Sequence, residues 1–221
     1  MEIKKFRNKY DLELIPASHE GIILGTLVWD PVIGKPSFDH PGMPDHIFNA
    51  FLDAEIMHME EWETALKEFR ESEVKEANIA ESVVNINVDV VSSLGQLGLG
   101  AIEGSFELKS IKKFTFGEIK VRYLSLLQRI QIDNYLEILK KDHWELYDGK
   151  IRRVFIISEL YYGSVKIVID KTLKSDLSGA IEKAGIEAKN VLELGNSVEY
   201  SFDHRNVPFA MKMELIRGFT S

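Results

Sequence analysis

The sequence contains no cysteine among its 221 residues, which excludes disulfides, thiolate metal sites and thiol catalysis. It also has no run of about 18 apolar residues, the length that a membrane-spanning helix requires. The first seven residues are basic and lack the apolar stretch of a signal peptide. These absences predict a protein that starts in the cytoplasm, without a helical anchor or a disulfide framework.

Long alternating stretches dominate residues 81–132 and 151–216. In the first stretch, apolar side chains alternate with polar ones from residue 84 to residue 90, and the same pattern recurs from Val207 to Leu215. Strict alternation predicts strands with one dry and one wet face. Nine residues in a strand reach roughly 30 Å, about the thickness of a hydrocarbon core, so a pore-forming protein has to be considered.

The remaining patterns predict an α+β fold, a twisted and mainly antiparallel sheet with peripheral helices, in a single domain over residues 1–221. The longest helix is expected within residues 45–80, with Asp45 as its N-cap, because apolar residues recur there at helical intervals. Proline-rich residues 30–46 predict a long loop. The sequence also predicts a first strand pair (12–15 and 22–29) and a short helix (134–141). After a hairpin turn at Asp148-Gly149, it predicts a strand (153–160) that turns at Gly163 into a second strand (165–170). A helix over 176–184 capped by Ser175 and a turn at Gly195-Asn196 complete the predictions.

Charge is unevenly distributed along the chain, whose net charge is −8. Between Phe51 and Glu81, ten acidic residues stand against three basic ones, a net charge of −7. Two segments are basic instead: residues 1–10, with four bases against one acid, and residues 109–129, with six bases against one acid. We therefore expect the acidic segment to face away from an anionic surface and the basic segments to be able to meet one.

Catalytic motifs are scarce. The six histidines form no H-E-x-x-H pair, and no serine stands in a G-x-S-x-G turn. The glycines between Gly98 and Gly104 have the wrong spacing for a phosphate loop, and the acidic balance argues against nucleic acid. We expect no enzyme activity, no cofactor and no metal; the alternative is a hydrolase or isomerase built around His40, His46 and His58, with Asp39 and Asp45 as neighbours.

The order of features resembles the pore-forming domain of the gasdermin family. The segments that carry the resemblance are the opening Y-D-L-E-L-I-P (10–16) with the strand 21–29, V-V-S-S-L-G-Q-L-G-L-G (90–100), D-N-Y-L-E-I-L (133–139), R-V-F-I-I-S-E-L (153–160) and N-V-P-F-A-M-K-M (206–213). The similarity covers nearly the whole chain as an order of elements. Animal members add a C-terminal repressor domain and bacterial members a lipidated N-terminal cysteine, and both are absent here. The chain is therefore most similar to short fungal gasdermin-like proteins, which regulate cell death in heterokaryon incompatibility; a pore-forming fragment of a longer protein is the alternative with the same sequence pattern.

The resemblance implies a gasdermin N-terminal-domain-like fold and a cell-death effector that binds acidic membrane phospholipids. Such a protein would oligomerise, with its own copies or with a variant of itself, and insert β-hairpins as a transmembrane β-barrel. It would move from the cytoplasm to the plasma membrane on activation. The predicted lipid-binding residues are Lys4, Lys5, Arg7, Lys9, Lys109, Lys112 and Lys113, and the predicted membrane-inserting residues are Val84, Ile86, Val88, Val90, Val165, Ile167 and Ile169.

A different class of function also fits the alternation. A soluble β-rich protein that binds a small molecule or a lipid would use the same dry faces to line a cavity. Release of dye from anionic liposomes distinguishes this class from a pore-forming protein.

Overall fold

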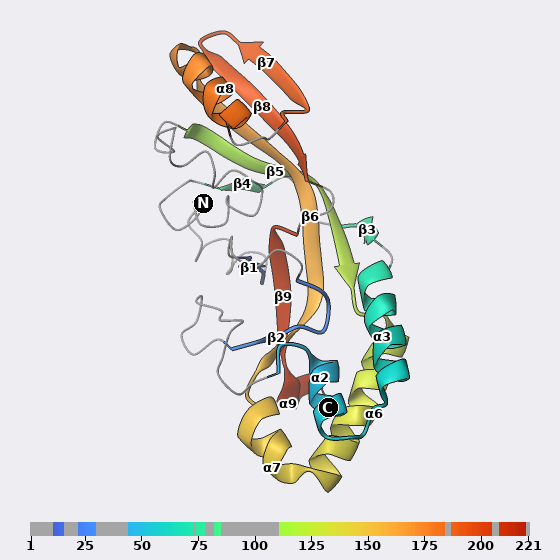
Figure 1. The fold of residues 1–221 in the computed structure, drawn as a ribbon. Coiled ribbons are helices and arrows are strands. Elements are labelled where there is room, and N and C mark those ends of the chain that lie inside the picture. Colours follow the sequence, from blue (N-terminus) through green and yellow to red (C-terminus); the bar gives the residue numbers. More distant parts are fainter. Residues whose placement is uncertain are drawn as a thin grey trace. The chain divides into compact units, whose positions relative to one another are not determined.

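The computed structural model describes residues 11–15, 22–29, 44–72, 74–77, 82–84, 111–183, 187–204 and 208–219 (Figure 1). Its elements in chain order are β1 (Glu13–Leu14), β2 (Leu27–Val28), α2 (Ile47–Asp53), α3 (Met59–Glu71), β3 (Val74–Glu76), β4 (Ser82–Val84), β5 (Ile111–Tyr123), α6 (Leu126–Asp142), α7 (Trp144–Leu146), η3 (Tyr147–Ile151), β6 (Phe155–Asp170), η4 (Lys171–Leu173), α8 (Lys174–Lys183), β7 (Asn190–Leu194), β8 (Ser197–His204), β9 (Ala210–Leu215) and α9 (Ile216–Phe219).

The fold is α+β, with a mainly antiparallel sheet and peripheral helices, as the sequence predicts. The pairings β1–β9, β2–β6, β4–β5, β6–β8 and β7–β8 are all antiparallel. The predicted first strand pair is wrong, because Leu14 of β1 pairs with Ala210 and Leu27 of β2 pairs with Ile156. Both strands take partners from far along the chain, which local patterning cannot reveal.

Two compact units are built from interleaved parts of the chain. Unit 1 comprises residues 1–21, 75–121 and 161–211, and unit 2 comprises residues 22–74, 122–160 and 212–221. Unit 1 holds the β6–β8–β7 ladder, α8, and the pairs β1–β9 and β4–β5. Unit 2 holds α2, α3, α6, α7, η3 and α9, together with β2 and the first residues of β6.

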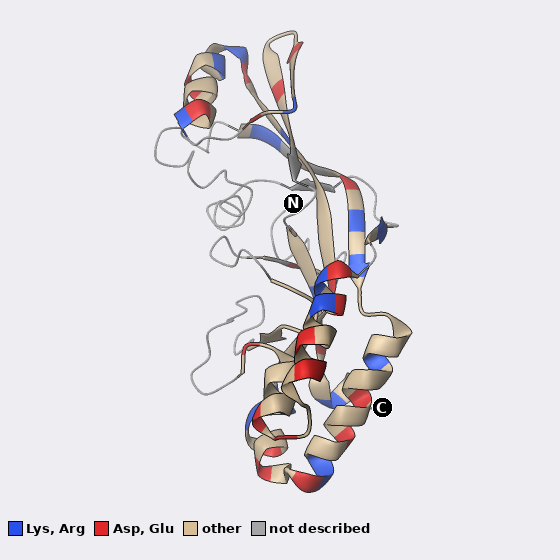
Figure 2. Ribbon diagram, turned by 45° about the vertical axis from the view of Figure 1, so that its right-hand side comes forward, with Lys and Arg blue, Asp and Glu red and all other residues tan. Residues whose placement is uncertain are grey.

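Residues 45–70 form two helices in unit 2, and not the single helix that their apolar spacing predicts. The first helix, α2, ends at Asp53, and Glu55 then adopts the left-handed conformation with φ 57°. The second, α3, has 13 residues and turns Leu66 and Phe69 towards the core. The exposed side of α3 carries Glu60, Glu61, Glu63, Glu68 and Glu71. This helix therefore presents half of the ten acidic residues of the acidic segment (Figure 2).

His46, not the predicted Asp45, is the N-cap of α2. The backbone N–H of Phe48 donates to His46 Nδ1 at 3.1 Å, so this nitrogen carries no proton. His46 Nε2 therefore carries the proton and donates to the Leu24 carbonyl at 2.9 Å. The imidazole is buried against the rings of Phe48 and Phe69, with centroids 5.0 and 6.0 Å away. Burial lowers the pKa of His46 from 6.5 to about 4, although the bond to Leu24 acts in the opposite direction.

The neutral state of His46 predicts a loss of stability in acid. In the unfolded chain the imidazole protonates near pH 6.5, whereas the folded protein keeps it neutral down to a pKa of about 4. Its contribution is therefore complete above pH 6.5 and is lost as the pH falls towards 4, by a total of about 3 kcal/mol. Urea unfolding at pH 7 and pH 4.5, followed by tryptophan fluorescence, measures this loss. The three tryptophans, Trp29, Trp62 and Trp144, all belong to unit 2, as His46 does.

The control for this experiment separates His46 from the carboxylates, which also titrate in acid. His46→Asn keeps a side-chain acceptor at the N-cap but cannot titrate, so its stability should depend less on pH than that of the wild type. His58→Asn changes an exposed N-cap of α3 that makes no side-chain capping hydrogen bond, and it should keep the wild-type dependence. Equal slopes in all three proteins would contradict the assignment to His46.

The longest helix in the described residues is α6, with 17 residues, so the prediction for residues 45–80 is wrong. It begins eight residues before the predicted Asn134, at a capping box in which Ser125 and Gln128 bond each other's backbone N–H. Ile132, Leu136 and Leu139 are buried. Arg129 forms a bidentate pair with Glu214, at 3.0 and 2.6 Å, which fixes α6 to β9 within unit 2.

Two predicted turns around β6 are also wrong. Asp148-Gly149 lies in η3, a π-helical turn in which Asp148 pairs with Arg152 at 2.6 Å. No turn occurs at Gly163, because β6 runs without interruption from Phe155 to Asp170. Gly163 instead allows a close approach: a Cβ there would lie 2.9 Å from the Gly117 carbonyl oxygen. By contrast, the predicted turn at Gly195-Asn196 joins β7 to β8 and is confirmed.

Candidate functional site

Three of the predicted membrane-inserting residues lie on β6, in unit 1, where the structure describes both strand pairing and burial. Val165, Ile167 and Ile169 are all buried and alternate with the partly exposed Lys166, Val168 and Asp170. Their partners on β8 are Phe202, Tyr200 and Val198, which are buried as well. Because directly opposed residues of an antiparallel pair share a face, these six side chains form one apolar face, called here the β6–β8 face.

The opposite face of the same ladder is polar. Lys166 lies opposite Ser201, Val168 opposite Glu199, and Asp170 opposite Ser197. Among the eight paired positions, the three pairs at 165, 167 and 169 form the apolar face, and the opposite face is polar except for Val168.

Helix α8 covers the β6–β8 face. Its residues Leu177, Ala180 and Ile181 recur at helical spacing and are buried, while the polar residues Asp176, Ser178 and Lys183 are exposed. The helix is therefore amphipathic, and its apolar row supplies the packing against the ladder.

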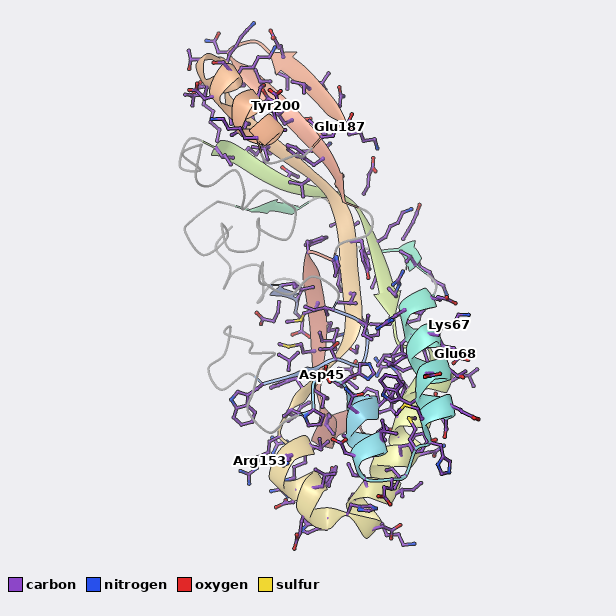
Figure 3. The ribbon with its side chains drawn as sticks, in the orientation of Figure 1. Asp45, Lys67, Glu68, Arg153, Glu187 and Tyr200 are labelled. Carbon is purple, nitrogen blue, oxygen red and sulfur yellow. The ribbon has the colours of Figure 1, made fainter. Side chains whose placement is uncertain are left out.

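A polar contact adds to this packing. The Tyr200 hydroxyl, at the end of a side chain in the apolar face, bonds the Ser178 hydroxyl at 2.7 Å and donates to the Lys174 carbonyl at 3.1 Å. Figure 3 shows Tyr200 on β8 beside this helix. The hydroxyl of this buried tyrosine therefore helps to keep α8 on the β6–β8 face, in addition to the apolar contacts.

Two lysines, Lys171 of η4 and Lys174 at the start of α8, contact β7. Lys171 and Lys174 contact Glu193 at 2.5 and 2.6 Å. Hydrogen bonds from Lys171 and then from Lys174 lower the pKa of Glu193 from 4.5 to about 2. Both ion pairs are exposed to solvent, so salt screens them and each contributes little to stability.

Of the predicted lipid-binding residues, the structure describes two. Lys112 and Lys113 are neighbours on β5, so their side chains point to opposite faces. Lys112 pairs with Asp170 at the end of β6, while the side chain of Lys113 is exposed. The positions of Lys4, Lys5, Arg7, Lys9 and Lys109 lie outside the described residues.

The first predicted inserting strand is described only at its start. Val84 is the last residue of β4 and pairs with Phe114 of β5, while Ile86, Val88 and Val90 lie outside the described residues. Only the second group, on β6, can therefore be placed on a defined face.

The described residues show no clustered histidine site for the alternative of a hydrolase or isomerase. His46 uses both ring nitrogens to hold the backbone, and His58 is the exposed N-cap of α3. His40 lies outside the described residues. Within the part of the chain that the structure describes, no three histidine or acidic side chains are grouped as metal ligands.

Sequence patterning identified the strand residues of the site but missed the contacts that hold α8. The alternation Val198, Tyr200, Phe202 is visible in the sequence and could have placed Tyr200 on a buried face. No sequence pattern pairs this tyrosine with Ser178, or Glu193 with the two lysines. These partners are about 20 residues apart and meet only when α8 folds back onto the ladder.

Among the described residues, no helix is both long enough and apolar enough to cross a membrane. Comparison with known proteins gives no family, since no family model and no curated protein matches the chain. A functional assignment therefore has to come from the chain's own residues.

Proposed function

We propose that this chain is a pore-forming protein of the gasdermin type. It docks on an anionic membrane, assembles with other copies and inserts β-hairpins as a transmembrane β-barrel. The observation that carries the proposal is the two-sided β6–β8 ladder, whose apolar face is covered by the short helix α8.

The two faces of the ladder suit the wall of a membrane barrel. Such walls alternate apolar residues towards lipid and polar residues towards the lumen. Val165, Ile167 and Ile169 would face lipid, while Lys166 and Asp170 would face water. The apolar pairs run from residue 165 to residue 169, roughly 16 Å, so both strands would have to lengthen on insertion to span the apolar band of about 25 Å on known barrels.

Helix α8 has to leave the β6–β8 face before that face can meet lipid. Three kinds of contact keep α8 on this face: its three buried apolar residues, the hydrogen bonds of the Tyr200 hydroxyl, and the exposed ion pairs of Glu193. A ten-residue helix is marginal on its own in water, so its structure depends on the face that it covers. Release of the helix and exposure of the face would therefore occur together.

Assembly has to accompany insertion. A lone hairpin in lipid leaves the N–H and C=O groups of its outer edges without partners, and only a closed barrel satisfies them. Several copies are therefore required in each pore. The N-terminal bases Lys4, Lys5, Arg7 and Lys9 provide the docking charge, with the exposed Lys113 as a further contact. The acidic side of α3 would be repelled by an anionic membrane and would face away from it.

Dye release from lipid vesicles tests the proposed function. We expect the purified chain to release a trapped dye from vesicles that contain phosphatidylserine and not from vesicles of phosphatidylcholine alone. Hydrogen exchange of the α8 amides should rise on the anionic vesicles, because the helix leaves its face. A chain that binds anionic vesicles, keeps α8 protected and releases no dye would instead be a lipid-binding protein.

Tyr200→Phe should accelerate the release of dye about fivefold. The variant keeps the ring but loses the hydroxyl contacts to Ser178 and Lys174, which contribute about 1 kcal/mol to holding α8. The initial rate of dye release measures the effect. Tyr135→Phe is the matched control, since it also loses a tyrosine hydroxyl contact, to Glu61, but in unit 2. Equal acceleration by both variants would contradict a specific role for the Tyr200 contact.

A further inference from the structure

Strand β7 forms the outer edge of the β6–β8–β7 ladder (Figure 1). Its five residues pair with β8, from Asn190 opposite Ser201 to Leu194 opposite Ser197. Within the described residues no strand pairs with its other edge. All five are exposed, including three apolar ones: Val191 at 41%, Leu192 at 45% and Leu194 at 56%.

This edge lacks the features that usually protect an edge strand. Natural sheets place proline, lysine or a bulge on such strands, because unpaired N–H and C=O groups recruit other strands. The sequence N-V-L-E-L contains no proline and no lysine, and its five residues keep one register with β8, although a bulge precedes them where the Lys189 N–H donates to the Ser201 carbonyl at 2.8 Å. Its single charge, on Glu193, is already matched by Lys171 and Lys174 of the same chain.

The two faces of β7 differ in what they present. Val191 and Glu193 lie opposite Tyr200 and Val198, so they are on the face that α8 covers. Leu192 lies opposite Glu199 and Leu194 opposite Ser197, so the two leucines are on the polar face of the ladder. Two exposed leucines thus stand at the outer edge of the described ladder, on a face whose other apolar side chain is the half-buried Val168.

We propose that two copies of the chain associate through β7, antiparallel, around a twofold axis at Leu192. In this register Leu192 meets Leu192 of the second copy, and Leu194 lies opposite Asn190. The four leucines of the two strands then form one cluster. Glu193 lies opposite Val191, so the two carboxylates do not oppose each other. The edge is therefore complementary to itself, which favours a second copy over an unrelated strand.

The association is weak, because five residues from each copy bury less than a standard interface of about 1,600 Å². We expect a dissociation constant on the order of 0.1 mM and hence a monomer–dimer equilibrium that depends on concentration. Association needs no membrane, so it can be tested separately from pore formation.

Sedimentation velocity in the absence of lipid tests the dimer. We expect the wild type to shift from monomer towards dimer as its concentration rises from about 10 to 500 µM. Leu192→Lys places two like charges against each other at the twofold axis and should remain monomeric over this range. Leu127→Lys is the matched control, because Leu127 is a 78% exposed leucine on α6, and this variant should associate as the wild type does. A wild type that stays monomeric, or equal behaviour of the two variants, would overturn the proposal.

Cysteine cross-linking tests the register, and the chain has no cysteine of its own. Leu192→Cys should oxidise to a covalent dimer, because opposed residues have Cα atoms about 4.5 to 5.5 Å apart, within the range of a disulfide. Leu194→Cys places the two thiols four residues out of register, about 13 Å apart, and should cross-link far more slowly. Equal yields from both variants would contradict the twofold axis at Leu192.

Discussion

Replacing Lys4, Lys5, Arg7 and Lys9 together with glutamate is expected to reduce binding to anionic vesicles by at least about a thousandfold. Each base near an anionic membrane contributes about 1 kcal/mol, and four give about 4 kcal/mol. Sedimentation with vesicles that contain phosphatidylserine, at physiological salt, measures the loss. Higher salt should weaken the binding of the wild type as well, because charges beyond about 8 Å are screened at physiological ionic strength and beyond shorter distances above it.

The control for this variant carries the same change in charge elsewhere. Replacing the exposed bases Lys67, Lys141, Lys150 and Lys183 with glutamate lowers the net charge equally. If docking is local to the N-terminal segment, the control should lose much less affinity. Equal losses would mean that binding follows net charge. Unchanged binding by the N-terminal variant would show that the N-terminal bases do not dock the protein, and residues 109–129 would become the next candidate.

Gly25→Ala is expected to lower the free energy of unfolding of unit 2 by about 4 kcal/mol. Gly25 has φ 83°, a conformation that costs other residues about 1 to 3 kcal/mol. An added Cβ would also lie 2.6 Å from His46 Nε2 and 3.1 Å from the Phe69 ring, and overpacking costs a further 1 to 3 kcal/mol or so. Displacing the imidazole would in addition weaken its bond to Leu24. Urea unfolding followed by tryptophan fluorescence reports the loss.

Two other glycines separate the contributions. Gly195 has φ 60° and nothing within 4 Å of an added Cβ, so Gly195→Ala should show the cost of the backbone conformation alone, about 1 kcal/mol. Gly149 has neither a positive φ nor a close neighbour, and Gly149→Ala should be neutral or slightly stabilising. Gly195 belongs to unit 1 and Gly149 to unit 2, so circular dichroism is the common measurement. Similar losses in all three variants would contradict a special role for the Gly25–His46 contact.

Sequence patterning predicted the fold class because period-two alternation survives in β8 and in β6 from residue 165 onwards, although β9 does not alternate: Ala210 and Met211 are both buried, and residues 212–215 are all half-buried. It failed where one local signal competed with another. Asp148-Gly149 is typical of a hairpin turn, yet Asp148 instead pairs with Arg152 four residues later, in a helical turn. A glycine such as Gly163 is typical of a turn, whereas its lack of a side chain here serves the close approach of Gly117. The partner of Gly163 is distant in the sequence and no short window reveals it, whereas the pair of Asp148 and Arg152 is local and competes directly with the turn signal.

The candidate site was predictable to the same extent. The apolar row on β6 could be read from its spacing, but its cover could not, because a hydroxyl contact such as that of Tyr200 leaves no periodic signal. The capping box of Ser125 and Gln128 is the opposite case. Its motif stands in the sequence, and applying it would have started α6 at the right residue.

The interleaving of the two units has a consequence for how the protein is made. Residue Leu14 pairs with Ala210 in unit 1, and Arg129 pairs with Glu214 in unit 2, so each unit depends on residues near 210. A chain emerging from the ribosome cannot complete either unit until these residues have been synthesised. Contacts that span so much of the sequence also slow folding. Translation and folding together therefore set a delay between the start of synthesis and the first native molecule.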